Sequence, residues 1–322
     1  MLEIYGRSIV NAILDTPLYL SLARRYIGIK LLNEKQPLFG SVDVCNVCNL
    51  HCKHCYWWLS REEGEDYGLS IEEWRVIIRR FFKRKVLHVG IAGGEPLLRY
   101  DVVRLFCEEM PGHVSVITNG TIPLQRIDGL YFYFVSLDGI KEAHDQIRGK
   151  GSYDTTRRNI LDYIKRYSTD GYKAWKDIWL SLTINSINYR FIEDYIKEWY
   201  GIVNKVAVQF HTPFIDDDPL MLRFGYKRDR VIDELLMLSK KYPNFIANKP
   251  KQLNLLRKSW GGKGRVPIAC PSWAVLALDH MGRVKKPCCI GSHDNSAVKP
   301  ICEECGLSIY SLLYSIGIKN NM

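Results

Sequence analysis

The sequence predicts an α/β fold built on a parallel, barrel-like sheet. Strand-like apolar runs and amphipathic helix-like segments alternate repeatedly between residues 38 and 210, which is the pattern of parallel strands joined by crossover helices. Polar residues and glycines gather where the apolar runs end, as they do in barrels whose active sites lie at the carboxyl edge of the strands. The 322 residues suffice for one large catalytic domain and a small appendage.

The expected elements follow from local signals. Ser70 and Glu73 form a capping box, so we expect a helix to begin there and to run to about residue 82. Short apolar runs that end in glycine or polar residues indicate buried strands. The expected strands are 38–44, 86–92, 113–118, 131–137, 178–185 and 205–210, and the further expected helices are 101–109, 154–167 and 189–200.

Composition and charge narrow the class of protein. Apolar residues make up 47% of the chain, so a sizeable core is available, and the formal net charge is +10, which allows an anionic partner. Ten cysteines in short-spaced groups, with no secretory signal, favour metal ligation in a reducing compartment over disulfides. We therefore expect a cytoplasmic protein, and no uncharged apolar run is long enough to span a bilayer.

We expect four segments along the chain. Residues 1–37 contain apolar side chains at helical spacing and predict two amphipathic helices. These helices either pack against the barrel or lie on a membrane surface as a peripheral contact. Residues 38–215 form the barrel, residues 216–267 a helical and basic connection, and residues 268–322 a cysteine-rich extension.

The central motif is the spacing of Cys48, Cys52 and Cys55 (CxxxCxxC). Thiolates are soft ligands that select iron–sulfur clusters or zinc. A cubane cluster needs four ligands, and this loop supplies three, so the motif predicts a [4Fe–4S] cluster with one iron open to a small molecule. Zinc favours paired C-x2-C units and a shell closed by protein ligands, which makes it the alternative.

Together with four further stretches in order, this motif resembles the radical S-adenosylmethionine (SAM) superfamily. The stretches are Gly93-Gly94-Glu95-Pro96, Thr118-Asn119-Gly120, Ser136-Leu137-Asp138-Gly139 and the run from His144 to Asp154. The resemblance implies a partial (β/α)6 TIM-like barrel that binds the cluster and SAM. It also implies reductive cleavage of SAM to a 5′-deoxyadenosyl radical, which takes hydrogen from an unactivated C–H bond.

The resemblance also implies a set of SAM-binding residues. They are Tyr56, Gly93, Gly94, Glu95, Pro96, Asn119, Ser136, Asp138, Arg148 and Asn185. The segment around Glu95 is expected to hold the methionyl ammonium, and its glycines let the backbone approach a ligand closely. A serine or asparagine at a strand end can instead be only a cap, and Arg148 can instead pair with Asp145.

A second cysteine group lies near the C-terminus, with a predicted β-hairpin at residues 277–284 between its first member and the others. It resembles the twitch or SPASM-like auxiliary-cluster extension of radical SAM proteins. That resemblance implies one auxiliary [4Fe–4S] cluster, and a structural zinc is the alternative. The expected ligands are Cys270, Cys288, Cys302 and Cys305, and Cys289 either replaces Cys288 or is free to act on a substrate radical.

The sequence indicates the substrate less directly than it indicates the clusters and SAM. The main hypothesis is a membrane lipid or isoprenoid, changed by oxidation or by a new C–C or C–S bond. It rests on the apolar N-terminal helices, the acid-free basic stretch at 244–278 and the apolar tail at 307–318. The alternative is a ribosomally made peptide. Nucleic acid is not favoured, because no RNA-binding module is appended.

We also expect a monomer that works under anaerobic conditions. The cluster chemistry implies an external electron donor resembling flavodoxin or ferredoxin.

Overall fold

The computed structural model describes residues 24, 27–29, 35–60, 67–84, 86–257, 270–293 and 299–318. Most of the expected N-terminal helices, and residues 258–269 of the basic stretch, lie outside the described residues.

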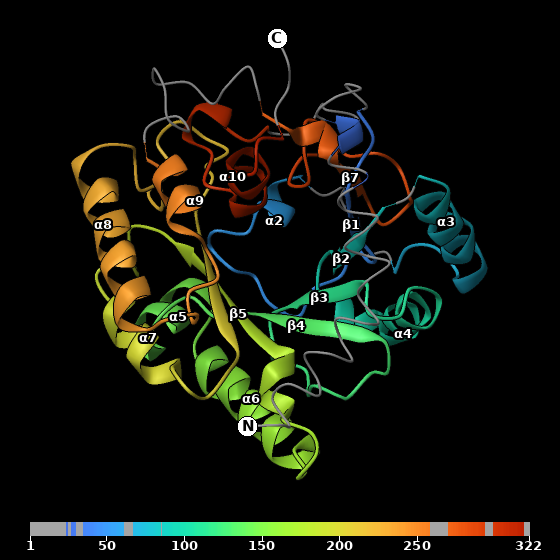
Figure 1. The fold of residues 1–322 in the computed structure, drawn as a ribbon, viewed down its shortest axis with the longest axis horizontal. Coiled ribbons are helices and arrows are strands. Elements are labelled where there is room, and N and C mark those ends of the chain that lie inside the picture. Colours follow the sequence, from blue (N-terminus) through green and yellow to red (C-terminus); the bar gives the residue numbers. More distant parts are fainter. Residues whose placement is uncertain are drawn as a thin grey trace.

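A curled sheet of seven parallel strands forms the body of the protein, in the order β6-β5-β4-β3-β2-β1-β7 (Figure 1). The predicted partial barrel is thus confirmed. The strands are β1 (Phe39–Asp43), β2 (His88–Ala92), β3 (Val114–Thr118), β4 (Leu130–Ser136), β5 (Ile178–Ile184), β6 (Lys205–Phe210) and β7 (Val275–Leu278).

Helices cover the outer side of the curled sheet, while α2 lies inside its curve (Figure 1). The described helices are α2 (Tyr56–Ser60), α3 (Ile71–Lys83), α4 (Tyr100–Glu109), α5 (Lys141–Arg148), α6 (Ser152–Tyr167), α7 (Ile192–Trp199), α8 (Tyr226–Lys241), α9 (Pro250–Leu255) and α10 (Ser308–Ser315). Because all the strands are parallel, their carboxyl ends meet at one edge, where the loops converge.

Helix α3 shows how local sequence and packing agree. The Ser70 hydroxyl accepts a hydrogen bond from the backbone N–H of Glu73, and the Glu73 carboxylate accepts one from the backbone N–H of Ser70, so the predicted capping box is present. Trp74 on the buried face of α3 packs against Phe106 of α4 with 5.7 Å between ring centroids. Apolar side chains of β1, β2 and β3 belong to the same core.

Strand β7 takes part in the predicted hairpin and also joins the sheet. The Lys285 N–H donates to the Ala277 carbonyl and the Asp279 N–H to the Arg283 carbonyl, both at 2.9 Å, and an antiparallel bridge joins Leu278 to Val284. On its other edge, Val275–Leu278 pairs parallel with β1 and extends the sheet, which the sequence did not indicate. The extension is thereby fixed to the strand that delivers the first cysteine loop.

The apolar tail is part of the core. Helix α10 buries Tyr310 and Leu313, and Leu307 and Ile318 on either side of it are also buried. These side chains form a second core with parts of the cysteine-rich extension. No helix among the described residues has the length and apolar character needed to cross a bilayer.

The free edge of β6 is closed by an asparagine side chain. Asn248 is buried; its Oδ1 accepts a hydrogen bond from the Val208 N–H at 2.7 Å, and its Nδ2 donates to the Val208 carbonyl at 3.0 Å. One side chain therefore replaces a neighbouring strand at this point. The end of β6, which carries Gln209 and His211, is held in place by this pairing.

Replacing Asn248 with alanine should lower the free energy of unfolding by about 2 kcal/mol, because a buried N–H and C=O of β6 would lose their partners. Denaturant unfolding followed by circular dichroism measures the change. The matched control is Asn254→Ala on the exposed face of α9, which should cost about 0.5 kcal/mol or less. Equal effects of the two substitutions would contradict the role given to Asn248.

Candidate active site

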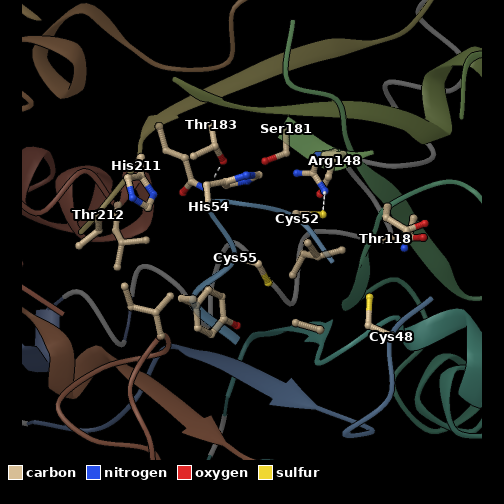
Figure 2. Close-up of a pocket in the computed structure, with 18 of the residues that line it drawn as sticks. Cys48, Cys52, His54, Cys55, Thr118, Arg148, Ser181, Thr183, His211 and Thr212 are labelled. Carbon is tan, nitrogen blue, oxygen red and sulfur yellow. Dashed lines mark hydrogen bonds between the residues drawn. The ribbon is translucent and has the colours of Figure 1, made fainter. Parts of the chain in front are cut away.

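The cysteine loop that follows β1 opens into a cavity at the carboxyl edge of the sheet (Figure 2). Cys48, Cys52 and Cys55 all line this cavity, whose volume is about 190 Å³. The structure thus brings the three motif thiols together around one space. Cys45, three residues before Cys48, is fully buried and lies outside the lining.

The thiols are shielded from water before any metal binds. Burial raises the pKa of Cys48 to about 12 and that of Cys55 to about 11. Metal ligation requires thiolates, so loading a metal here releases protons.

The spacing of these thiols bears on which metal centre they fit. Within the described residues, no three His, Cys, Asp or Glu side chains are grouped closely enough to hold a single metal ion. Three thiols of one loop that line a single cavity fit a cubane cluster with its fourth iron open, as the motif predicts.

The segment after β2 fixes the cysteine loop through backbone hydrogen bonds. The N–H groups of Gly94 and Glu95 donate to the carbonyls of Cys45 and Val47 at 3.1 and 2.8 Å. A Cβ atom at Gly94 would lie 1.8 Å from the Val47 carbonyl oxygen, so no other residue fits there.

The Glu95 carboxylate points into the protein and not into the cavity. It is fully buried and accepts hydrogen bonds from the Thr118 hydroxyl at 2.7 Å and from the N–H groups of Asn119 and Leu97 at 2.8 and 3.1 Å. Although three donors favour its charged form, burial raises the pKa of Glu95. Glu95 therefore ties β2 to the end of β3.

A buried ion pair lies beside Cys52. Arg148 donates through Nε to Asp138 at 2.6 Å, and its Nη1 lies 3.8 Å from the Cys52 sulfur. Burial raises the pKa of Asp138, but the charge of Arg148, helped by His54 and His144, outweighs it and lowers the pKa. The ion pair thus fixes the Arg148 guanidinium beside Cys52 at the cavity wall.

His54, between two of the motif cysteines, is also buried at this pair. Its Nε2 lies 3.4 Å from Asp138 Oδ2, and its Nδ1 has no hydrogen-bond partner among the described residues. Burial lowers the pKa of His54 to about 4, so the imidazole is neutral at neutral pH.

The predicted SAM-binding residues divide into two groups. Tyr56, Gly93, Gly94, Asn119, Ser136 and Arg148 line the cavity, whereas Glu95, Pro96, Asp138 and Asn185 lie behind its wall. Asn185 caps the turn after β5: its backbone N–H donates to Asn188 Oδ1, and its Oδ1 accepts from the Ile187 N–H. Arg148 pairs with Asp138, and Asp145 instead accepts the N–H groups of Gly151 and Tyr153.

Sequence reasoning missed a polar wall opposite the cysteine loop. Ser181 and Thr183 of β5 and Gln209 and His211 at the end of β6 line the cavity, and Figure 2 shows three of them, Ser181, Thr183 and His211, along one rim. Gln209 donates to the Thr183 hydroxyl at 3.2 Å. The signal was present, because these residues occupy alternate positions of two otherwise apolar strands and therefore share the inner face.

His211 is held by a carboxylate. Its Nε2 lies 2.7 Å from Asp218 Oδ2, and its backbone N–H donates to the Ile184 carbonyl at 2.8 Å. The imidazole is thus fixed at the end of β6, edge-on to His54 with 6.2 Å between ring centroids. A hydrogen bond from Nε2–H to Asp218 leaves the other ring nitrogen as an acceptor.

A second cavity, of about 110 Å³, lies in the C-terminal extension. Cys270, Cys288, Cys302 and Cys305 all line it, and Cys289 does not. Burial raises the pKa of Cys305 to about 12. The four thiols expected to hold an auxiliary centre therefore face one space.

Cys289 lies between the two cavities and not in either lining. Its backbone N–H donates to the Tyr310 hydroxyl at 3.1 Å. The ammonium of Lys285, buried in an ion pair with Asp43, lies 5.1 Å from the centre of the Tyr56 ring. Tyr56 also lines the first cavity and Tyr310 lines the second, so these contacts connect residues of the two linings.

The two cavities share a wall. Thr212, Ile290 and Leu307 line both of them. The polar end of β6 and the cysteine-rich extension are thus in direct contact. Groups bound in the two cavities would be separated by single side chains.

Comparison with known proteins gives a consistent result. A family model described as the radical SAM superfamily matches residues 42–174. The Fe-coproporphyrin III synthase of Methanosarcina barkeri is 34% identical over 155 residues, which are 45% of this chain and 36% of that protein. The sporulation killing factor maturation protein SkfB of Bacillus subtilis is 25% identical over 199 residues, 58% of this chain and 44% of that protein. The chain therefore spans less than half the length of these relatives.

Among solved structures, SuiB of Streptococcus suis bound to S-adenosylmethionine aligns with a TM-score of 0.61 at 15% identity. The alignment covers 87% of this chain and 70% of SuiB, and at that identity it shows a shared fold. The family match includes the end of β1, the cysteine loop and strands β2, β3 and β4. From this match and the partial barrel with its cysteine loop, we conclude that residues 42–174 form a radical SAM domain.

Proposed function

We propose that this protein is a radical SAM enzyme that activates a C–H bond of a peptide substrate in the first cavity. The observation that carries the proposal is the cavity itself, where three motif thiols face a polar wall across the carboxyl edge of a partial barrel. Cys48, Cys52 and Cys55 would hold a [4Fe–4S] cluster. When bound, the cluster and SAM supply the radical that removes hydrogen from the substrate.

The residues around this cavity bind, orient and exclude water. The close approach of Gly93 and Gly94 to the cysteine loop leaves backbone groups to face SAM. Arg148, fixed by Asp138, offers a cation for a carboxylate and offsets the negative charge of the thiolates. Apolar lining residues such as Ile117, Phe210 and Leu307 keep the space dry, which protects a radical from side reactions.

The extension at residues 268–322 would hold one auxiliary [4Fe–4S] cluster through Cys270, Cys288, Cys302 and Cys305. Their common cavity supports this ligand set, and the position of Cys289 outside the lining favours Cys288 as the ligand. Cys289 then remains a candidate for contact with the substrate. An external electron donor resembling flavodoxin or ferredoxin would reduce the protein.

Two observations favour a peptide over a lipid. The wall opposite the thiols carries Ser181, Thr183, Gln209 and His211, which suit amide and other polar groups better than a hydrocarbon chain. The apolar tail that suggested lipid contact is packed in the core as α10. The names of two similar proteins agree, because SkfB is a maturation protein and SuiB has been solved bound to the precursor peptide SuiA.

Replacing Cys52 with alanine should abolish SAM cleavage, because the cluster would lose one of its three protein ligands. The measurement is 5′-deoxyadenosine formation, by mass spectrometry, in anaerobically reconstituted and reduced protein. Cys107→Ala is the control, because Cys107 is buried in α4 away from both cavities. Cleavage retained by the Cys52→Ala protein would refute the cluster assignment.

Iron content should report the two sites separately. The reconstituted parent should hold about eight irons, and the variant with Cys48, Cys52 and Cys55 all changed to alanine should hold about four. Substituting Cys270 and Cys305 instead should also leave about four, with SAM-cleaving ability retained. A parent with about four irons and one zinc would place zinc, and not a cluster, in the extension.

The substrate class can be tested with fractions of the source organism. We expect the peptide and small-protein fraction to stimulate 5′-deoxyadenosine formation above the background of SAM cleavage without substrate. A component of that fraction should lose mass equal to two hydrogens on cross-linking or oxidation. The total lipid extract is the second arm, and the Cys52→Ala protein is the control in both. Stimulation by lipid alone would overturn the peptide proposal.

A further inference from the structure

Arg228, in the first turn of α8, is the most deeply buried cation outside the first cavity in the described part of the chain. It has no exposed surface. The guanidinium lies between two aromatic rings, 4.2 Å from the centre of Phe210 and 4.1 Å from that of Phe224. Both contacts are within the range of cation–π attraction.

The polar contacts of Arg228 do not neutralise its charge. Nε donates to the Leu256 carbonyl at 2.9 Å, and Nη2 donates to the Cys305 carbonyl at 3.3 Å. Nη1 is buried and has no hydrogen-bond partner among the described residues. No carboxylate in the described part of the chain forms an ion pair with it, whereas the other buried arginine, Arg148, is paired with Asp138.

A buried cation without a counter-ion is costly for a fold. Burial lowers the pKa of Arg228 to about 10, so the guanidinium still carries its charge at neutral pH. The two carbonyl groups, the two rings and the carboxylates of Glu304 and Asp229, which act on Arg228 without forming an ion pair with it, offset only part of the cost. The structure therefore calls for an anionic group near this position.

The second cavity can supply that group. Cys305 lines it, and its own carbonyl is the acceptor for Arg228. A metal centre held by four thiolates is net negative, and reduction of an iron–sulfur cluster adds a further negative charge. Nearby charge is one of the factors that set the reduction potential of such clusters.

We propose that Arg228 is the buried counter-charge of the metal–thiolate centre held by Cys270, Cys288, Cys302 and Cys305. It stabilises the reduced cluster more than the oxidised one, which raises the reduction potential. It also ties occupancy of the site to the packing of α8 on the extension. This inference rests on the auxiliary centre in the proposed function and assigns Arg228 a positioning and charge role, without contact with substrate.

The test uses the full chain with Cys48, Cys52 and Cys55 changed to alanine, so that only the auxiliary cluster is present. Arg228→Met keeps an apolar side chain of similar length between the two rings and removes the charge, and Arg228→Lys keeps the charge. Arg230→Met, two residues further along α8 at an exposed position, is the matched control. The readout is the midpoint of a redox titration followed by electron paramagnetic resonance.

At a fixed potential, we expect Arg228→Met to lower the ratio of reduced to oxidised cluster at least tenfold. For a one-electron couple, this corresponds to a midpoint potential that is lower by about 59 mV. Arg228→Lys should retain most of the parent value, and Arg230→Met should match the parent. A fully loaded Arg228→Met protein with an unchanged midpoint would overturn the inference. A parent without iron at these thiols would instead overturn the auxiliary cluster.

A second measurement separates charge from packing. Before metal loading, the Arg228→Met protein should unfold at the same denaturant concentration as the parent or a higher one, because an unpaired buried charge has been removed. The increase in midpoint on loading the thiols with iron or zinc should be smaller than in the parent. If Arg228→Met instead lowers the denaturation midpoint by the same amount before and after metal loading, Arg228 is a packing residue and the proposal is refuted.

Discussion

Two fully buried carboxylates, Glu95 and Asp138, hold the first cavity in shape. Glu95 ties the segment under the cysteine loop to the end of β3 through Thr118 and Asn119. Asp138 anchors Arg148 beside Cys52. A buried carboxylate is tolerated only when donors surround it, so each fixes the groups around it. The cysteine loop takes its position from these contacts and from the hydrogen bonds that the Gly94 and Glu95 N–H groups donate to the carbonyls of Cys45 and Val47.

The two thiol-lined sites differ in how the buried cation near each one is compensated. In the first, the cation beside the thiols is already paired with Asp138, so the charge near the cavity is balanced in the protein itself. In the second, Arg228 forms no ion pair with a carboxylate in the described part of the chain, and we propose that a centre held by the thiols supplies the counter-charge. On this proposal, the first site suits a ligand that enters and leaves, and the second suits a resident centre.

The sequence predicted the parts of the fold that depend on local pattern. The strands at 178–184 and 205–210 and helix α3 follow from apolar periodicity and a capping box, and motif spacing indicated the thiols of both sites. It failed where partners are distant: β7 pairs with β1, which lies far earlier in the chain. In the basic run 227–230, only Arg228 is buried, and no periodicity distinguishes it from its neighbours. The pairing of His211 with Asp218 depends on a turn without a pattern of its own.

The end of β6 joins the two sites mechanically. The Phe210 N–H donates to the Gly306 carbonyl at 3.0 Å, and the Gly306 N–H donates to the Thr212 hydroxyl at 2.9 Å. A Cβ atom at Gly306 would lie 2.1 Å from the Phe210 carbonyl oxygen, so only glycine lets the chain after Cys305 approach this closely. His211 lies between the two residues that make these bonds. The position of the chain after Cys305 and the position of the polar wall of the first cavity, where the substrate is proposed to bind, are therefore fixed by the same hydrogen bonds.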